Sequence, residues 1–293
     1  MIGYDDDLLD LYYDFVVTRH SIWTKRQQGF PQPWTANDVL ARRKFTNCFR
    51  VLDPGSQFVL TDINGVRPID LIARLVFYRI TNLPSTWHAI LEGMGRYPTA
   101  RTFVNEPDTL FDVLDDHRQT GNRVFSGAYV ILPNPGKKGD KVRDAITLTK
   151  RFVEEYAEDF LEMQTQEDRF NVLRSNPGYG KFLSMQVLTD WGYCQEENLE
   201  NEFVVAGPGA IRGTGFLNDE KTPVEVISDM HRFWDGRPEV RLGRNSLSLM
   251  DVQNTFCEFG KYVKELQKPT KKTLYKPAHP GPQPKPVLPV WMT

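Results

Sequence analysis

The chain has 293 residues, 40% of them hydrophobic, and its 36 Lys and Arg against 38 Asp and Glu give a formal net charge of −2. That hydrophobic fraction supports a real core, whereas the charge balance excludes a protein that binds nucleic acid through overall basicity. Three scattered cysteines without a CxxC pair and five histidines without HxH or HxxxH spacing argue against a disulfide framework and a histidine-built metal centre. Mg²⁺ bound through carboxylates stays open.

The chain lacks the sequence features of a membrane or secreted protein. No stretch approaches about 18 apolar residues, and the N-terminus begins with Asp5-Asp6-Asp7, where a signal peptide would carry basic residues. We therefore expect a soluble cytoplasmic protein with no membrane partner.

The N-terminal part of the sequence is typical of short, closely spaced helices. Apolar positions recur at helical spacing from Asp7 to Gln28, and Gly29 with the prolines after it ends this helix. Further helices are expected over residues 69–82, 85–93 and 106–120.

A second helix is expected to start near the N-cap residues Asn37 and Asp38 and to run to about Leu52. Phe45 and Phe49 would mark its buried face. Its opposite face would carry three polar side chains, either solvated or functional: Arg43, Asn47 and Arg50.

Residues 124–133 form a short apolar run that fits a strand or a buried helix, and we favour the helix. One helix is expected to carry apolar side chains at helical spacing, and another to cover about residues 167–174. The apolar side chains are Phe152, Tyr156, Phe160 and Met163. These patterns predict an all-α domain over residues 1–267, followed by an extended or disordered tail over 268–293 rich in Pro and Lys.

The segment from Ser175 to Gly180 joins two predicted helices and has the form of a helix-hairpin-helix turn. Gly178 and Gly180 would let the backbone approach a DNA phosphate, with Lys181 beside them. An ordinary corner between two helices explains the same residues equally well.

A second glycine-rich segment runs from Phe203 to Gly213. Gly207 and Gly209 with Arg212 fit a wall that binds a polyphosphate or a flipped base, because a guanidinium suits phosphate. A structural loop is the alternative. The Walker sequence GxxxxGK[ST] is absent from the chain, which excludes an autonomous P-loop kinase.

The predicted helix that begins at Asp251 has two distinct faces. An apolar stripe consists of Val252, Phe256, Phe259 and Val263. A polar stripe consists of Asp251, Asn254, Glu258 and Lys261. The polar stripe is either functional or solvated, with Glu258 and Lys261 as an ion pair, and Cys257 fits a buried thiol better than a nucleophile.

These segments together resemble one family, whose members are called 5-hydroxymethyl-uracil DNA kinase helical domains and α-glutamyl/putrescinyl thymine pyrophosphorylases. The resemblance spans roughly residues 8–265. It rests on residues 18–22, 33–35, 44–50 with Asp53, 125–129, 178–182 with Asp190, 203–210 and 251–262. Thr18-Arg19 and Asp53-Pro54 depart from the expected Glu-Arg and Asp-Arg.

The resemblance implies a DNA-glycosylase-like, helix-hairpin-helix fold and a role in phages that replace thymine, within the cytoplasm of an infected bacterial cell. The partners would be double-stranded DNA with a modified thymine, an amino acid or polyamine co-substrate, and an upstream 5-hydroxymethyl-uracil DNA kinase. Without a kinase motif, the chain fits the branch that displaces pyrophosphate from 5-pyrophosphoryloxymethyl-uracil with an amine. A glycosylase or lyase for modified bases, or a non-catalytic DNA-binding module, are the rival hypotheses.

Residue roles follow as expectations. Pyrophosphate and base would be bound by Arg19, Asn47, Arg50, Gly207, Gly209, Arg212, Asn254 and Lys261. The DNA backbone would be bound by Gly178, Gly180 and Lys181. The candidates for the catalytic carboxylate, which the sequence does not rank, are Asp53, Asp190, Glu202 and Glu258.

Overall fold

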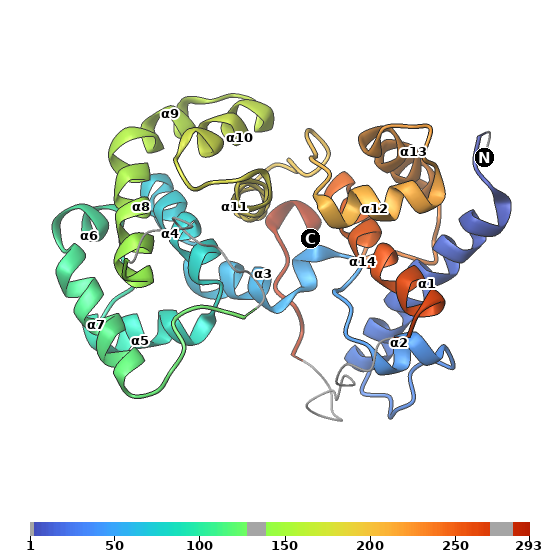
Figure 1. Cartoon of the computed structure of the whole chain (residues 1–293), viewed down its shortest axis with the longest axis horizontal. Helices are drawn as coiled ribbons and strands as arrows, with labels where there is room; N and C mark the ends of the chain where they lie inside the picture. The colour runs from blue at the N-terminus through green and yellow to red at the C-terminus, as the bar shows by residue number, and fades with distance from the viewer. Residues whose placement is uncertain (1–2, 128–138, 270–283) are drawn as a thin grey trace. The chain divides into compact units, whose positions relative to one another are not determined.

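A computed structural model describes residues 3–127, 139–269 and 284–293 of the chain. Every regular element in these ranges is helical, and β pairing there is limited to an isolated bridge between Leu242 and Asn245 (Figure 1). The predicted all-α class is therefore confirmed. None of the helices in these ranges is both long enough and apolar enough to cross a lipid bilayer.

The chain divides into two compact units. Unit 1 combines Met1–Asp53 with Phe203–Thr293, and unit 2 is Pro54–Glu202. The expectation of a single domain over residues 1–267 stays a prediction.

Unit 1 brings together helices from both ends of the chain. They are α1 (Asp6–Gln27), α2 (Asp38–Arg42), the 3₁₀ turn η1 (Arg50–Leu52), α12 (Pro208–Leu217), α13 (Pro223–Asp235), α14 (Leu249–Gln267) and the 3₁₀ turn η3 (Val290–Met292). Side-chain caps fix where the long helices begin: Asp5 accepts from the backbone N–H of Leu8 at the start of α1, and Ser248 forms a capping box with Asp251 at the start of α14.

The core of unit 1 is aromatic. Tyr12 of α1 stacks on Phe256 of α14 with ring centroids 4.6 Å apart, and the edge of Trp234 from α13 closes the group. Helix α12 lies against α14 in close contact (Figure 1). The positions on α14 that form its apolar stripe, Val252 and Phe259 among them, are buried as predicted.

Unit 2 is a bundle of short helices around a buried central one, α4. Its elements are α3 (Pro54–Phe58), the π turn η2 (Val59–Ile63), α4 (Pro68–Thr81), α5 (Pro84–Met94), α6 (Ala100–Asn105), α7 (Pro107–Gln119), α8 (Lys141–Glu155), α9 (Ala157–Glu162), α10 (Gln166–Ser175) and α11 (Lys181–Tyr193). Proline begins α4, α5 and α7, because the first turn of a helix does not use the N–H that proline lacks. Helix α4 is buried from Asp70 to Thr81 and packs against α11 and α8.

The helices expected over residues 7–28, 69–82, 85–93, 106–120 and 167–174 are confirmed to within two residues at each end as α1, α4, α5, α7 and α10. The helix expected to run from residue 37 to residue 52 is wrong. Helix α2 ends at Arg42, residues 43–49 are irregular, and only Arg50–Leu52 turns again. Phe45 and Phe49 are nevertheless buried, as expected.

Two further expectations need correction or restriction. The single helix drawn through Phe152 and Met163 is broken, because Tyr156 has φ −134° and ψ −17°, so α8 ends at Glu155 and α9 follows. Helix α6 had no counterpart in the sequence analysis. Of the apolar run 124–133, residues 124–127 are not helical, and the rest lies outside the described residues.

Within the expected tail, the last ten residues are described. Val290–Met292 form a 3₁₀ turn, Met292 is buried, and its carbonyl accepts a hydrogen bond from Asn245 Nδ2 at 3.0 Å. The end of the chain is therefore attached to unit 1.

Candidate functional site

The irregular segment between Arg43 and Asp53 in unit 1 is fixed by carboxylates that accept its backbone N–H groups. Glu258 Oε2 accepts from Thr46 at 3.2 Å, and Asp251 Oδ1 accepts from Arg50 at 2.7 Å. Asp53 Oδ1 accepts from Asn47 N at 3.1 Å. These side chains take the place of helical carbonyl acceptors, which explains why the predicted helix does not form here.

The polar stripe of α14 faces this segment. Asp251, Asn254 and Glu258 are 2%, 6% and 5% exposed, so the solvated alternative is wrong for these three residues. Asn254 Nδ2 donates to the carbonyl of Asn47 at 2.9 Å. Lys261 remains exposed and pairs with Glu258 at 2.7 Å. Burying carboxylates is costly unless they are bonded or paired, and here they are.

Two buried arginines belong to the same cluster. Arg19 of α1 donates through Nη2 to the carbonyls of Phe45 and Thr46, at 2.8 Å for Phe45. Burial lowers the pKa of Arg19, while the charges of Glu258 and Asp53 oppose that change. Arg50 is also buried, and its guanidinium lies close enough to Asp53 to stabilise that carboxylate electrostatically.

The carboxylates beside Arg50 titrate near neutral pH. Burial raises the pKa of Asp53 to about 6, although Arg50 and the N–H of Asn47 both favour the charged form. Burial also raises the pKa of Asp251 to about 6 against hydrogen bonds from the backbone of Arg50 and Ser248. A carboxylate with a pKa in this range can accept a proton at neutral pH and release it again.

We call these residues the unit 1 cluster: Arg19, Asn47, Arg50, Asp53, Asp251, Asn254 and Glu258. All but Asp251 were predicted site residues, and they come from three segments that are far apart in the sequence. Asp251 was noticed on the polar stripe but was not selected. Within the described residues, no group of three or more His, Cys, Asp or Glu side chains is arranged to hold a metal ion.

The glycine-rich segment 203–213 is partly the helix α12 and not only a loop. A Cβ on Gly209 would lie 2.3 Å from Cys257 Sγ, and one on Gly213 would lie 2.0 Å from the carbonyl oxygen of Phe256. Close packing on α14 therefore accounts for both glycines. Gly207 is the N-cap of α12, and Arg212 is exposed on that helix.

Cys257 is held between these helices. Burial raises the pKa of its thiol, and the nearby carboxylate of Glu258 adds to the effect. A protonated thiol against Gly209 fits packing and not nucleophilic attack.

The other two candidate carboxylates lie in unit 2. Asp190 of α11 is fully buried and forms a bidentate ion pair with Arg79 of α4. Glu202 is exposed at the end of the unit. Burial lowers the pKa of Arg169, and the charge of Glu202 partly opposes that change.

The predicted hairpin turn joins α10 to α11 in unit 2. Gly178 has φ +91°, a conformation that favours glycine, and Tyr179 anchors the turn by donating its hydroxyl to the carbonyl of Val76 at 2.9 Å. Gly178, Gly180 and Lys181 are exposed, so the turn can be reached by a large ligand. Its DNA-binding role stays a prediction.

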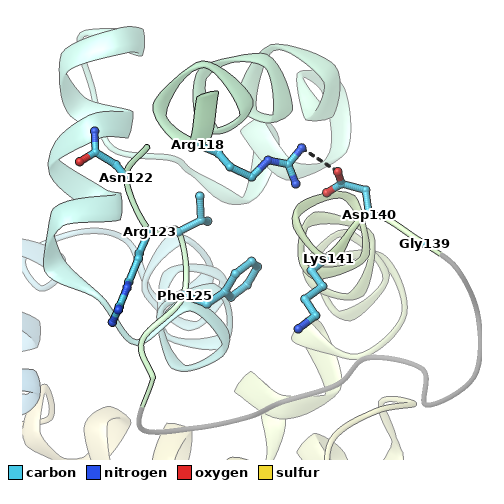
Figure 2. A pocket seen from close by; sticks show the side chains of 8 residues that line it. Arg118, Asn122, Arg123, Phe125, Gly139, Asp140 and Lys141 are labelled. Atoms are coloured by element: carbon cyan, nitrogen blue, oxygen red, sulfur yellow. Dashed lines mark ion pairs between the residues drawn. The ribbon is translucent and has the colours of Figure 1, made fainter. Parts of the chain in front are cut away.

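Unit 2 also has a cavity of about 420 Å³, which the sequence analysis did not identify (Figure 2). Its lining combines Arg118, Arg123 and Lys141 with the ring of Phe125. Arg118 is paired with Asp140 at 2.8 Å. Phe125 is the first residue of one motif of the family resemblance, residues 125–129. Arg118 and Arg123 precede this motif, and in the sequence only the local excess of positive charge would have pointed to them.

Comparison with known proteins gives one family. The sequence profile described as "5-hmdU DNA kinase, helical domain" matches residues 6–272. A "5-hmdU DNA kinase" of Bacillus phage SP10 is 24% identical in an alignment that covers 87% of this chain and 45% of that protein. The chain thus spans about half the length of this relative. No solved structure matches significantly.

Proposed function

Because the chain belongs to the 5-hmdU DNA kinase helical-domain family, we propose that it acts on thymine-derived bases in double-stranded DNA. The proposed reaction takes place at 5-pyrophosphoryloxymethyl-uracil. The primary amine of an amino acid such as glycine or glutamate, or of putrescine, replaces pyrophosphate on the exocyclic methylene. This places the protein in a phage thymine-hypermodification pathway, in the cytoplasm of the infected cell and downstream of a 5-hydroxymethyl-uracil DNA kinase.

The chemistry requires one proton acceptor and a site for a polyanion. The co-substrate ammonium gives one proton to a base, its nitrogen then forms the C–N bond, and the C–O bond breaks with its electron pair leaving on pyrophosphate. The product is a secondary ammonium on the base. Donation from the pyrimidine ring assists the departure of the leaving group.

The unit 1 cluster supplies these groups, and it is the observation that carries the proposal. Asp53 has its pKa raised to about 6, so it is ionised at neutral pH and can take the ammonium proton. Both hydrogen bonds from Asn47 fall on its Oδ1. In this proposal Asp53 Oδ2 accepts the ammonium proton, and the guanidinium groups of Arg19 and Arg50 bind pyrophosphate.

Several of the other predicted residues have supporting roles in this proposal. Asn254 and Glu258 hold the backbone that carries Asn47 and Arg50. Lys261 and Arg212, both exposed in unit 1, are assigned to phosphates of the DNA. The hairpin turn of unit 2, with Gly178, Gly180 and Lys181, is assigned to the DNA backbone.

A second function is favoured by the length of the relative. The chain covers 45% of a protein named as a kinase, and it has no Walker sequence of its own. A non-catalytic module that presents modified DNA to a separate kinase would have the same family membership.

The deciding experiment incubates the protein with duplex DNA that contains 5-pyrophosphoryloxymethyl-uracil and with glycine, glutamate or putrescine, and then analyses the nucleosides by mass spectrometry. An amine adduct with release of pyrophosphate is the expected result. An abasic site would indicate a glycosylase, and unchanged nucleosides with tight DNA binding would indicate the module. Parallel reactions with Mg²⁺ and with EDTA test for a metal.

The Arg50→Met variant should lose the adduct while it keeps its fold. Arg232→Met is the matched control, because Arg232 is an exposed arginine of unit 1 that pairs with Asp229 on α13. Equal activity of Arg50→Met and Arg232→Met would remove Arg50 from the mechanism.

A further inference from the structure

The connection between α1 and α2 in unit 1 carries an exposed phenylalanine, Phe30. Phe30 leaves 56% of its surface exposed, compared with 43% for Phe182, the other strongly exposed phenylalanine of the described residues. By sequence, this stretch is expected only to end a helix. A single exposed apolar side chain is ordinary on a protein surface, and Phe30 becomes a candidate ligand contact because Lys25 and Arg26 precede it in the same segment.

The loop that carries Phe30 is braced on both sides of the ring. The Phe30 N–H donates to the carbonyl of Lys25 at 3.0 Å, and its carbonyl accepts from Trp34 Nε1 at 2.7 Å. Lys25 Nζ donates to the carbonyl of Trp34 at 2.8 Å, and the guanidinium of Arg26 lies 5.3 Å from the centroid of the Trp34 ring. The backbone that carries the ring is therefore held in place, which lowers the entropy cost of using this loop to bind.

The last turn of α1, which leads into this loop, is positively charged and lies on the same helix as Arg19 of the unit 1 cluster. Arg26 follows Arg19 by seven residues on α1, which is two helical turns and about 10 Å on one face. Its charge reaches Arg19 and contributes to lowering the pKa of Arg19. An aromatic ring that follows Lys25 and Arg26 in the chain combines a stacking surface with groups that attract phosphate.

We propose that Phe30 is a wedge that inserts between base pairs of duplex DNA next to the target thymine derivative. This inference rests on the proposed function, since it names the way in which the target base becomes accessible. A base taken out of the helix leaves a gap in the stack, and a planar apolar ring fills that gap at the least cost. Lys25 and Arg26 would contact the flanking phosphates, two turns of α1 from the arginine that receives the leaving group.

The test uses the full-length chain and a duplex oligonucleotide with 5-hydroxymethyl-uracil, in which 2-aminopurine is the neighbouring base. Insertion of Phe30 unstacks 2-aminopurine and raises its fluorescence. The Phe30→Ala variant should lose this rise and bind the duplex on the order of 10-fold more weakly. Phe30→Trp should keep both properties, because an indole also stacks.

Val224→Ala is the matched control, since Val224 is an exposed apolar residue of unit 1 on α13, and it should behave like the wild type. Circular dichroism of each variant verifies the fold, which an exposed side chain does not determine. If Phe30→Ala gives the wild-type fluorescence rise and Kd, or if the wild type gives no rise, the wedge is wrong. Unchanged fluorescence together with altered sedimentation of Phe30→Ala would also overturn it, in favour of contact with a second copy.

Different results reject the wedge and the proposed reaction. A fluorescence rise that depends on Phe30, without any amine adduct, would support the wedge and reject the transferase. An adduct formed equally well by the wild type and Phe30→Ala, with an unchanged Kd, would support the transferase and reject the wedge.

Discussion

The two units each bury arginines against aspartates, but they use them differently. In unit 2, Asp190 and Arg79 bind each other through both carboxylate oxygens, fully enclosed between α4 and α11. In unit 1, Asp53 and Asp251 accept backbone N–H groups of an irregular segment, and Arg19 donates to backbone carbonyls. The pair in unit 2 closes on itself, whereas the cluster in unit 1 holds a segment of chain in place.

The contrast indicates which candidate carboxylates can exchange a proton with a substrate. A carboxylate whose two oxygens are occupied by one buried guanidinium has a structural role, because it is already paired where no substrate reaches it. A carboxylate with a pKa near neutral and with bonds on one oxygen can exchange a proton. On this basis Asp53, and not Asp190, is the proposed base.

The largest effect is expected from breaking the pair in unit 2. Asp190→Asn leaves the charge of Arg79 buried without its counter-ion, so the free energy of unfolding should fall by about 3–5 kcal/mol. Urea unfolding followed by tryptophan fluorescence measures this change. The Arg79→Met/Asp190→Leu double variant should recover most of the loss, since it removes both charges.

An Asp190→Asn variant with the stability of the wild type but without activity would reverse the comparison. Asp190 would then take part in the reaction, and its ion pair with Arg79 would be the arrangement before the substrate binds.

The next largest effect on the free energy of unfolding is expected from disturbing the packing of α12 on α14. Gly213→Ala would place a methyl group 2.0 Å from the carbonyl oxygen of Phe256, so we expect a loss of about 3 kcal/mol in the free energy of unfolding. Gly215→Ala, two residues later in the same helix, meets no atom within 4 Å and should stabilise the protein by about 0.5–1 kcal/mol. Thermal unfolding of the two variants side by side distinguishes packing from helix propensity. Equal effects would show that α12 is not held against α14.

The smallest effect is a dependence of stability on pH. The folded pKa of Asp53, about 6, lies above its unfolded value of about 4, so the folded state binds the proton more tightly between these values. The contribution of Asp53 to stability should therefore rise as the pH falls from 7 to 5, by about 1 kcal/mol. Asp251 should act in the same direction. Urea unfolding at pH 7 and pH 5 should show a smaller increase for Asp53→Asn than for the wild type, and an equal increase would contradict the raised pKa.

Local patterns in the sequence were sufficient for five of the helices. Periodicity, N-cap residues and prolines predicted α1, α4, α5, α7 and α10 closely, because each of these signals acts within a few residues. The helix expected through Phe45 failed because the acceptors that hold this segment are 201 and 212 positions away, at Asp251 and Glu258.

Because sequence signals act over only a few residues, the candidate site was predicted only in part. The residues of the unit 1 cluster could be selected by residue type and by the family resemblance, but the groups that each residue contacts could not. Nothing local indicates that Gly209 and Gly213 serve the contact with α14, or that Asp190 is closed by Arg79, 111 residues away. Phe30 was missed because exposure of a loop side chain depends on the hydrogen bonds that brace the loop.

The most direct test of the account is the rate of amine-adduct formation by Asp53→Asn, measured in single turnover at neutral pH on duplex DNA with 5-pyrophosphoryloxymethyl-uracil. Loss of a general base should slow this step by about 100-fold or more, while the affinity for DNA stays within about 2-fold of the wild type. A rate equal to that of the wild type would contradict the assignment of the chemistry to the unit 1 cluster.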